Sequence, residues 1–177
     1  MRSSIAWSFS RGRADPPARA CFRLVDEERV TLCVSAPILA EVRDVLTRPK
    51  TQEWFPVLLP EWVETFVENV QSNAVVLAEV PQTFRLERDP KDEPYLDLAI
   101  ATQAHYLVSR DLDLLDLMND ASFRRRYPGL TILGPAAFLH AIAREAQAGG
   151  QASKESPEAA HARETDSSEG ERAEGKE

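Results

Sequence analysis

The chain has few cysteines, no glycine-rich phosphate loop and no long apolar run. Its two cysteines, Cys21 and Cys33, lack the spacing of a zinc or redox motif and cannot build a disulfide framework, so we expect them to be reduced and buried. The missing glycine-rich turn between a strand and a helix disfavours a nucleotide-binding module. Without a membrane-spanning stretch or an apolar leader, the chain is expected to be soluble and cytoplasmic.

The length of 177 residues fits one domain of ordinary size. The net charge of −8 is unevenly spread, because arginines gather near the start and glutamates near the end, so the overall sign says little about nucleic acid. Residues 146–177 contain almost no large apolar side chain and cannot offset the entropy of ordering. We therefore expect a domain over residues 1–145, followed by a disordered polar tail.

Strand-like and helix-like apolar patterns alternate between these ends. Ser35 can cap a helix that has Pro37 in its first turn, and Arg48 before Pro49 predicts the end of that helix. The alternation predicts an α/β domain with a mainly parallel central sheet flanked by helices. The expected strands cover residues 30–34, 74–77, 106–109 and 130–133, and the expected helices cover residues 35–48, 61–70, 94–104, 112–118 and 135–145.

Acidic side chains gather where a strand and two helices are expected to meet. Asp92 and Glu93 precede one expected helix, and Asp111 and Asp113 follow an expected strand. Carboxylates so crowded repel one another unless a hard cation such as Mg²⁺ or Mn²⁺ lies between them. The arrangement therefore predicts a metal-binding site. The structural alternative for any single acid is a helix cap or a partner of the helix dipole.

Glu41 is the one acid on the early helix that stands out. It lies three residues after Ile38 and four before Val45, so it flanks the apolar stripe of that helix instead of standing opposite it. Its carboxylate is either a rim group in water or an acid aimed at the end of the sheet.

Four blocks of the chain, in residues 34–42, 48–50, 88–93 and 107–115, resemble PIN domains in the correct order. The closest group is the toxins of bacterial toxin–antitoxin systems, and the resemblance extends from about residue 16 to residue 139. It implies a PIN-like fold and a ribonuclease that depends on Mg²⁺ or Mn²⁺. Its expected partners are RNA, a cognate antitoxin and a second copy of the chain.

The resemblance also implies roles for individual acids. Glu41, Asp92 and Asp111 match acids that hold the metal ion, and Asp113 matches the second acid of the motif that follows the strand. Glu93 is the alternative to Asp92, because its separation from Asp111 fits the spacing in other PIN toxins. The choice between these two neighbours stays open.

Basic side chains near the acids are candidates for binding the phosphates of RNA. They are Arg110 and, further along the chain, Arg124 and Arg125. For Arg124 and Arg125, the alternative is a solvated loop with no role in binding. Asp97 lies about one turn into a helix, where a side chain facing solvent is the expectation.

The start of the chain departs from the family. PIN domains begin with a buried strand that ends in Asp-Thr-Asn or a close variant, whereas here no acid precedes Asp15. We therefore expect the first strand and one metal ligand to be missing, through a start site placed too late or a degenerate gene. The strands near Thr31 and Val108 are then expected to have unpaired edges. With that ligand missing, we expect the chain to be an impaired nuclease. The alternative is a noncatalytic PIN scaffold that binds a protein or RNA.

Overall fold

The computed structural model describes residues 2–7, 16–54 and 59–152. The chain divides into two units, of which Met1–Ile142 contains the whole sheet and Ala143–Glu177 contains the end of the last helix. Within the described ranges, no helix combines the length and the apolar character needed to cross a bilayer.

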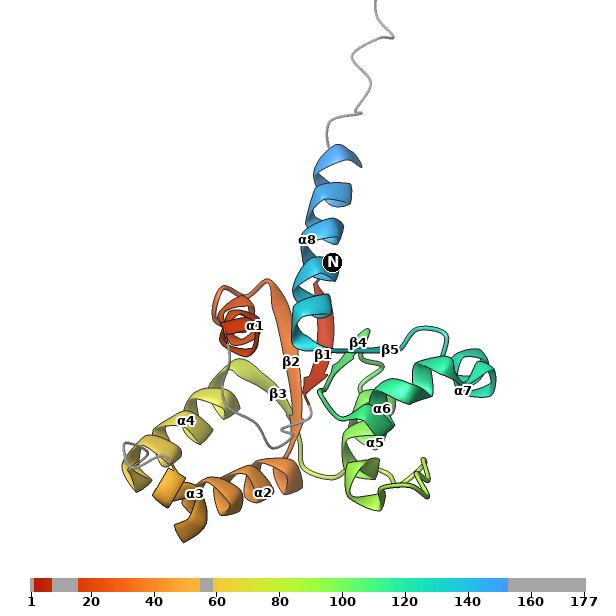
Figure 1. Cartoon of the computed structure of the whole chain (residues 1–177). Helices are drawn as coiled ribbons and strands as arrows, with labels where there is room; N and C mark the ends of the chain where they lie inside the picture. Colours follow the sequence, from red (N-terminus) through yellow and green to blue (C-terminus); the bar gives the residue numbers. More distant parts are fainter. Residues whose placement is uncertain (1, 8–15, 55–58, 153–177) are drawn as a thin grey trace, which may run out of the picture. The chain divides into compact units, whose positions relative to one another are not determined.

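The first unit is built on a five-stranded sheet with the order β3-β2-β1-β4-β5 (Figure 1). All four pairings are parallel. The strands are β1 (Ser3–Trp7), β2 (Val30–Ser35), β3 (Ala74–Leu77), β4 (Tyr106–Val108) and β5 (Thr131–Leu133). The expected α/β class with a parallel central sheet is thus confirmed, and the four strands expected from the sequence are all present.

Helices connect the strands and supply the remaining core. They are α1 (Pro16–Asp26), α2 (Ala36–Thr47), α3 (Pro49–Trp54), α4 (Pro60–Asn73), α5 (Glu93–Ala101), α6 (Leu112–Asp116), α7 (Ala121–Arg126) and α8 (Pro135–Ala152), with 3₁₀ turns η1 (Pro90–Asp92) and η2 (Leu117–Asn119). The Ser35 hydroxyl accepts a hydrogen bond from the Ile38 amide at the start of α2, as its sequence predicts. α8 continues past residue 145, where the tail was expected to begin, and residues 153–177 lie outside the described ranges.

The prediction that the first strand is missing is wrong. β1 lies at the centre of the sheet, where Ile5 is aligned with Leu32 of β2 on one side and with Tyr106 of β4 on the other. The strands that were expected to have bare edges therefore both pair with it. The sequence concealed this strand because it is short, begins with two serines and lacks the terminal acid on which the expectation relied.

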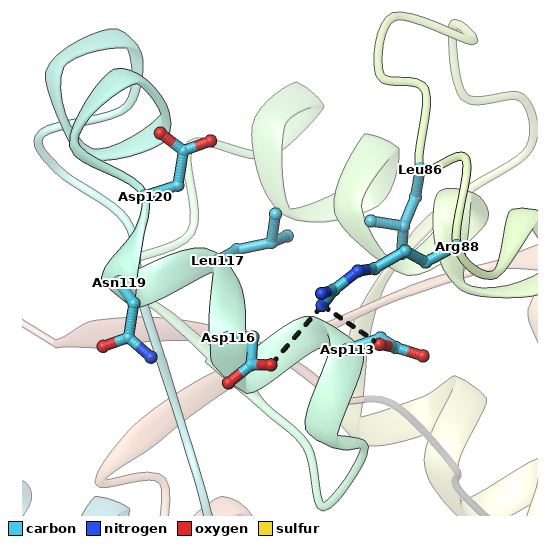
Figure 2. A pocket seen from close by; sticks show the side chains of 7 residues that line it. All are labelled: Leu86, Arg88, Asp113, Asp116, Leu117, Asn119 and Asp120. Atoms are coloured by element: carbon cyan, nitrogen blue, oxygen red, sulfur yellow. Dashed lines mark hydrogen bonds and ion pairs between the residues drawn. The ribbon is translucent and has the colours of Figure 1, made fainter.

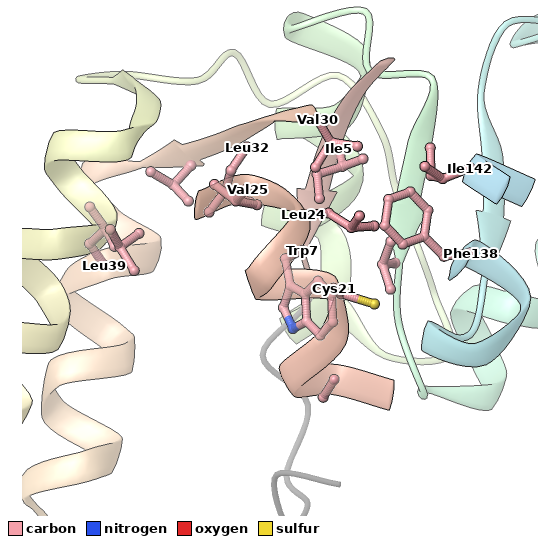
Figure 3. Close-up of a cluster of buried hydrophobic side chains, with 14 residues drawn as sticks. Ile5, Trp7, Cys21, Leu24, Val25, Val30, Leu32, Leu39, Phe138 and Ile142 are labelled. Atoms are coloured by element: carbon pink, nitrogen blue, oxygen red, sulfur yellow. The ribbon is translucent and has the colours of Figure 1, made fainter. Parts of the chain in front are cut away.

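Side chains of β1 contribute to the cores on both faces of the sheet, because successive residues of a strand point to opposite sides. Ile5 and Trp7 join the cluster shown in Figure 3, which includes Cys21 of α1 and Phe138 of α8. Ala6 joins the cluster on the other face, which contains residues of α2, α5 and α6. Ile5 and Ala6 are fully buried, so β1 is a core strand of this domain.

Replacing Ile5 with alanine tests this position directly. Ile5→Ala should lower the free energy of unfolding by about 2–5 kcal/mol, because it opens a cavity beneath a fully buried side chain. Val75→Ala is the matched control on the edge strand β3, where the side chain is half exposed, and it should cost well under half as much. Urea denaturation of both variants gives the comparison, and equal losses would remove β1 from the core.

Candidate metal site

The candidate site lies at the carboxyl end of the sheet, the end where open parallel α/β sheets place their ligands. β4 ends at Val108 and leads through Ser109 to Asp111, which caps α6. η1 ends at Asp92, which immediately precedes α5. The structure thus brings together acids from two separate segments, as the sequence predicts.

Asp111 is held by its own turn. Its side chain accepts a hydrogen bond of 2.8 Å from the Asp113 amide, and its own amide donates one of 3.0 Å to the Ser109 hydroxyl. Ser109 is 2 % exposed, so the start of this turn is fixed in the interior. The cap uses Oδ1 of Asp111, and the carboxylate remains half-buried at the end of the sheet.

Asp92 is the most buried of the candidate metal-site acids. The residue is 9 % exposed, and its Oδ2 atom is buried without a hydrogen-bond partner among the described residues. Burial raises the pKa of Asp92 from 3.8 to about 6, with further contributions from the negative charge of Asp111, the charge of Asp89 and a hydrogen bond shared with Asp111. Asp92 and Asp111 are therefore close neighbours whose charges repel.

Glu41 reaches the same region from α2 through a tyrosine. The Tyr95 hydroxyl donates a hydrogen bond of 3.5 Å to Oε2 of Glu41. Burial and then the charges of Glu41 and Asp92 raise the pKa of Tyr95 far above its ordinary value, so its hydroxyl stays protonated at neutral pH. Tyr95 therefore interacts electrostatically with the carboxylates of both Glu41 and Asp92. It was not among the residues selected from the sequence, where a tyrosine in the first turn of a helix gives no signal of its own.

Glu93 faces a different set of partners from its neighbour Asp92. Its Oε1 atom accepts a hydrogen bond of 2.9 Å from the Leu86 amide, and its Oε2 atom pairs with Arg85 at 3.0 Å. Both oxygens are therefore engaged in holding the segment that precedes η1. Of the two neighbours between which the sequence did not decide, only Asp92 has an oxygen without a hydrogen-bond partner in the described ranges.

Asp97 continues this anchoring one turn further along α5. It is 3 % exposed, and its Oδ1 atom accepts hydrogen bonds from the Thr83 amide, the Thr83 hydroxyl and the Phe84 amide at 2.8–3.0 Å. The expectation of a solvent-facing Asp97 is therefore wrong. The residue satisfies backbone groups of an extended segment that has no regular structure of its own, and that segment leads to η1 and Asp92.

Asp113 lines an open pocket of about 390 Å³ (Figure 2). Arg88 reaches between Asp113 and Asp116, with Nη1 at 3.4 Å from an oxygen of each. The positive charge of Arg88 therefore partly balances the negative charge of Asp113, although Asp113 is only two residues from Asp111. The other side chains that line the pocket are Leu86, Leu117, Asn119 and Asp120.

The basic candidates lie on two elements. Arg110 is in the turn between β4 and α6, next to Asp111. Arg124 and Arg125 lie in the last turn of α7 and not in a loop, but their side chains are exposed, as the alternative of a solvated segment expects. No hydrogen bond or ion pair joins Arg124 or Arg125 to a candidate acid in the ranges that the structure describes.

The donor set suits a hard cation that keeps much of its own water. In the described part of the chain, no three of the histidine, cysteine, aspartate and glutamate side chains lie close enough to hold a metal ion together. Mg²⁺, however, is usually bound by one or two carboxylates plus waters and substrate phosphates. Asp92 and Asp111 provide two such carboxylates. The buried Oδ2 of Asp92 has no hydrogen-bond partner among the described residues, so a cation could bind to it.

Comparison with known proteins identifies the family of this chain. A family model described as PIN domain matches residues 4–113, well over half of the chain. The chain therefore belongs to the PIN domain family, whose general function is that of a nuclease. No curated protein and no solved structure gives a match.

The pKa of Asp92 makes a prediction about stability. Because the folded pKa of about 6 exceeds the ordinary value of 3.8, the charged carboxylate destabilises the fold above pH 6, and this cost disappears as the pH falls to 3.8. Asp92→Asn should therefore stabilise the metal-free protein by about 1–3 kcal/mol at pH 8 and have almost no effect near pH 3.5. Urea denaturation at both pH values measures the difference.

Asp26→Asn, at the exposed end of α1, is the control and should change stability little at either pH. A destabilised Asp92→Asn protein at pH 8 would show that the carboxylate stabilises the fold and is not strained by its neighbours.

Proposed function

We propose that this PIN domain is an endoribonuclease that depends on Mg²⁺ or Mn²⁺. The observation that carries the proposal is the pair of carboxylates, Asp92 and Asp111, brought together at the carboxyl end of the sheet with a buried oxygen of Asp92 lacking a partner among the described residues. Two repelling acids cost the fold stability, and a functional site is the usual reason for retaining such a cost.

In this proposal, Asp92 and Asp111 would hold the cation. Glu41 would act on it from α2 without being a third direct ligand, because no three acids of the described residues lie close enough to share one ion. When bound, the cation supplies a polarised phosphate oxygen and a coordinated water of lowered pKa. Asp113 would help to orient the attacking water. Glu93, although it matches a family acid by spacing, holds the backbone before η1 and acts on the reaction through Asp92.

The substrate is held through its phosphates by the basic residues around the acids. We assign this role to Arg110 in the turn after β4 and to Arg124 and Arg125 on α7, of which the last two have exposed side chains. As in the toxin group that the sequence resembles, the chain would act in the cytoplasm with a cognate antitoxin, and a homodimer is its assembly.

One observation favours a second candidate, a noncatalytic PIN scaffold that binds a protein or RNA. β1 ends at Trp7 without an acid, and no acid precedes Asp15 in the sequence. Since the family supplies one metal ligand from the end of this strand, the site has fewer carboxylates than an efficient nuclease. If the chain is an enzyme, we therefore expect it to cleave RNA slowly. If it is a scaffold, it should not cleave RNA at all.

The ribonuclease is tested with a fluorescent single-stranded RNA in Mn²⁺, Mg²⁺ or EDTA. The wild-type chain should cleave slowly in Mn²⁺ and not in EDTA, and Asp111→Asn should reduce the rate at least a hundredfold, because the amide keeps the shape of the carboxylate and loses its charge. Glu93→Gln is the matched variant. Its amide oxygen can still accept the Leu86 hydrogen bond, so at least a tenth of the activity should remain.

Cleavage that survives EDTA, or full activity in Asp111→Asn, would contradict the metal mechanism. RNA binding without any cleavage in Mn²⁺ would favour the scaffold instead.

A further inference from the structure

Tyr95 connects the two sides of the candidate site. We propose that it is a positioning residue, whose hydroxyl holds the Glu41 carboxylate of α2 at the edge of the candidate site. The inference rests on the proposed function for its consequence in metal binding, but its structural part concerns the metal-free protein and can be tested separately.

The ring of Tyr95 is locked in the core. The residue is 6 % exposed and belongs to the buried cluster that contains Ile38 and Val42 of α2 and Leu96 of α5. Ile38 and Val42 lie on either side of Glu41 along α2, so the ring shares its cluster with the two buried residues that flank that acid. A tyrosine held in this way places its hydroxyl at a fixed point with little further loss of entropy.

Glu41 is fixed by little else. It is exposed on α2, and the Tyr95 hydroxyl, 3.5 Å from Oε2, is its one hydrogen-bond or ion-pair partner among the described residues. A free glutamate on a helix surface samples several rotamers and loses entropy when it binds a ligand. The hydrogen bond from Tyr95 restricts that freedom in advance and leaves Oε1 of Glu41 available.

The same tyrosine lies close to the other acids. It stands three residues after Asp92, which is one helical turn and places the two side chains on the same side of the start of α5. Asp92 in turn adjoins Asp111. The order Glu41, Tyr95, Asp92 and Asp111 therefore joins acids of three separate segments, and the hydroxyl is the link without which Glu41 is only a rim residue of α2.

The first test uses metal-free protein. Three-bond NMR couplings of Glu41 should show one dominant χ1 rotamer in the wild-type chain and averaging over several rotamers in Tyr95→Phe, which removes the hydroxyl and keeps the ring. Tyr106→Phe is the control, because Tyr106 packs against the cluster on the opposite face of the sheet and should leave Glu41 unchanged. Averaging in the wild-type chain would overturn the proposal.

The second test is a double-mutant cycle for Mn²⁺ binding, measured by calorimetry at pH 7.5. Tyr95→Phe should weaken binding about tenfold, in the range known for residues that orient a metal ligand. Glu41→Gln should weaken it at least as much, and the double variant should be no worse than Glu41→Gln alone, since the hydroxyl then has no carboxylate to position. Additive losses would overturn the proposal.

The two tests separate the failure of this inference from the failure of the proposed function. A fixed Glu41 in a chain that does not bind Mn²⁺ keeps the positioning role and removes the metal site. Normal Mn²⁺ binding in Tyr95→Phe keeps the metal site and removes the positioning role. A thermal melt of each variant checks that it folds. If Tyr95→Phe does not fold, Glu41→Gln, at an exposed position, still shows whether the Glu41 carboxylate contributes to Mn²⁺ binding.

Discussion

The sheet depends on a strand between β2 and β4, because each of these pairs with β1 and not with the other. Parallel strands bury both faces, so the central one needs apolar or small residues on each side. Ile5, Ala6 and Trp7 meet this requirement with five residues of strand. They do not provide an acid. The segment thus completes the sheet of a PIN domain with a strand that carries no acid.

The acids that remain are divided between holding the backbone and making the site. Glu93 and Asp97, one turn apart on α5, use their oxygens to satisfy amides of the segment before η1. That segment is thereby fixed, and it delivers Asp92 to the end of the sheet beside Asp111. The carboxylates at 93 and 97 lower the energy of the fold, whereas the pair at 92 and 111 raises it through repulsion and burial. Only the second pair is a candidate to be relieved by a cation.

Local signals were sufficient for much of the fold. Ser35 and Pro37 predict the start of α2, the apolar run from Ala74 to Leu77 predicts β3, and Asp111 follows the apolar run that forms β4. β1 was missed because its residues carry no alternation when both faces are buried, and because its identification relied on a terminal acid. A strand of this kind is recognised only from its neighbours in the sheet.

The site was predictable as a group of acids, but not in its division of labour. Asp92 and Glu93 are adjacent, so sequence spacing cannot separate them, while the turn from η1 into α5 points them to different partners. The role of Asp97 depends on amides more than ten residues away, and that of Tyr95 on a residue of another helix. These contacts are set by tertiary packing, on which local patterns carry no information.

Proton release on Mn²⁺ binding tests the central claim, the carboxylate pair as a cation site, most directly. Calorimetry at pH 6 in buffers of different ionisation enthalpy gives the number of protons released per ion bound. With a pKa of about 6 for Asp92, the wild-type chain should release about half a proton, because binding requires the charged carboxylate, and Asp92→Asn should release almost none. Equal release by the two proteins, or no Mn²⁺ binding by the wild-type chain, would contradict the account.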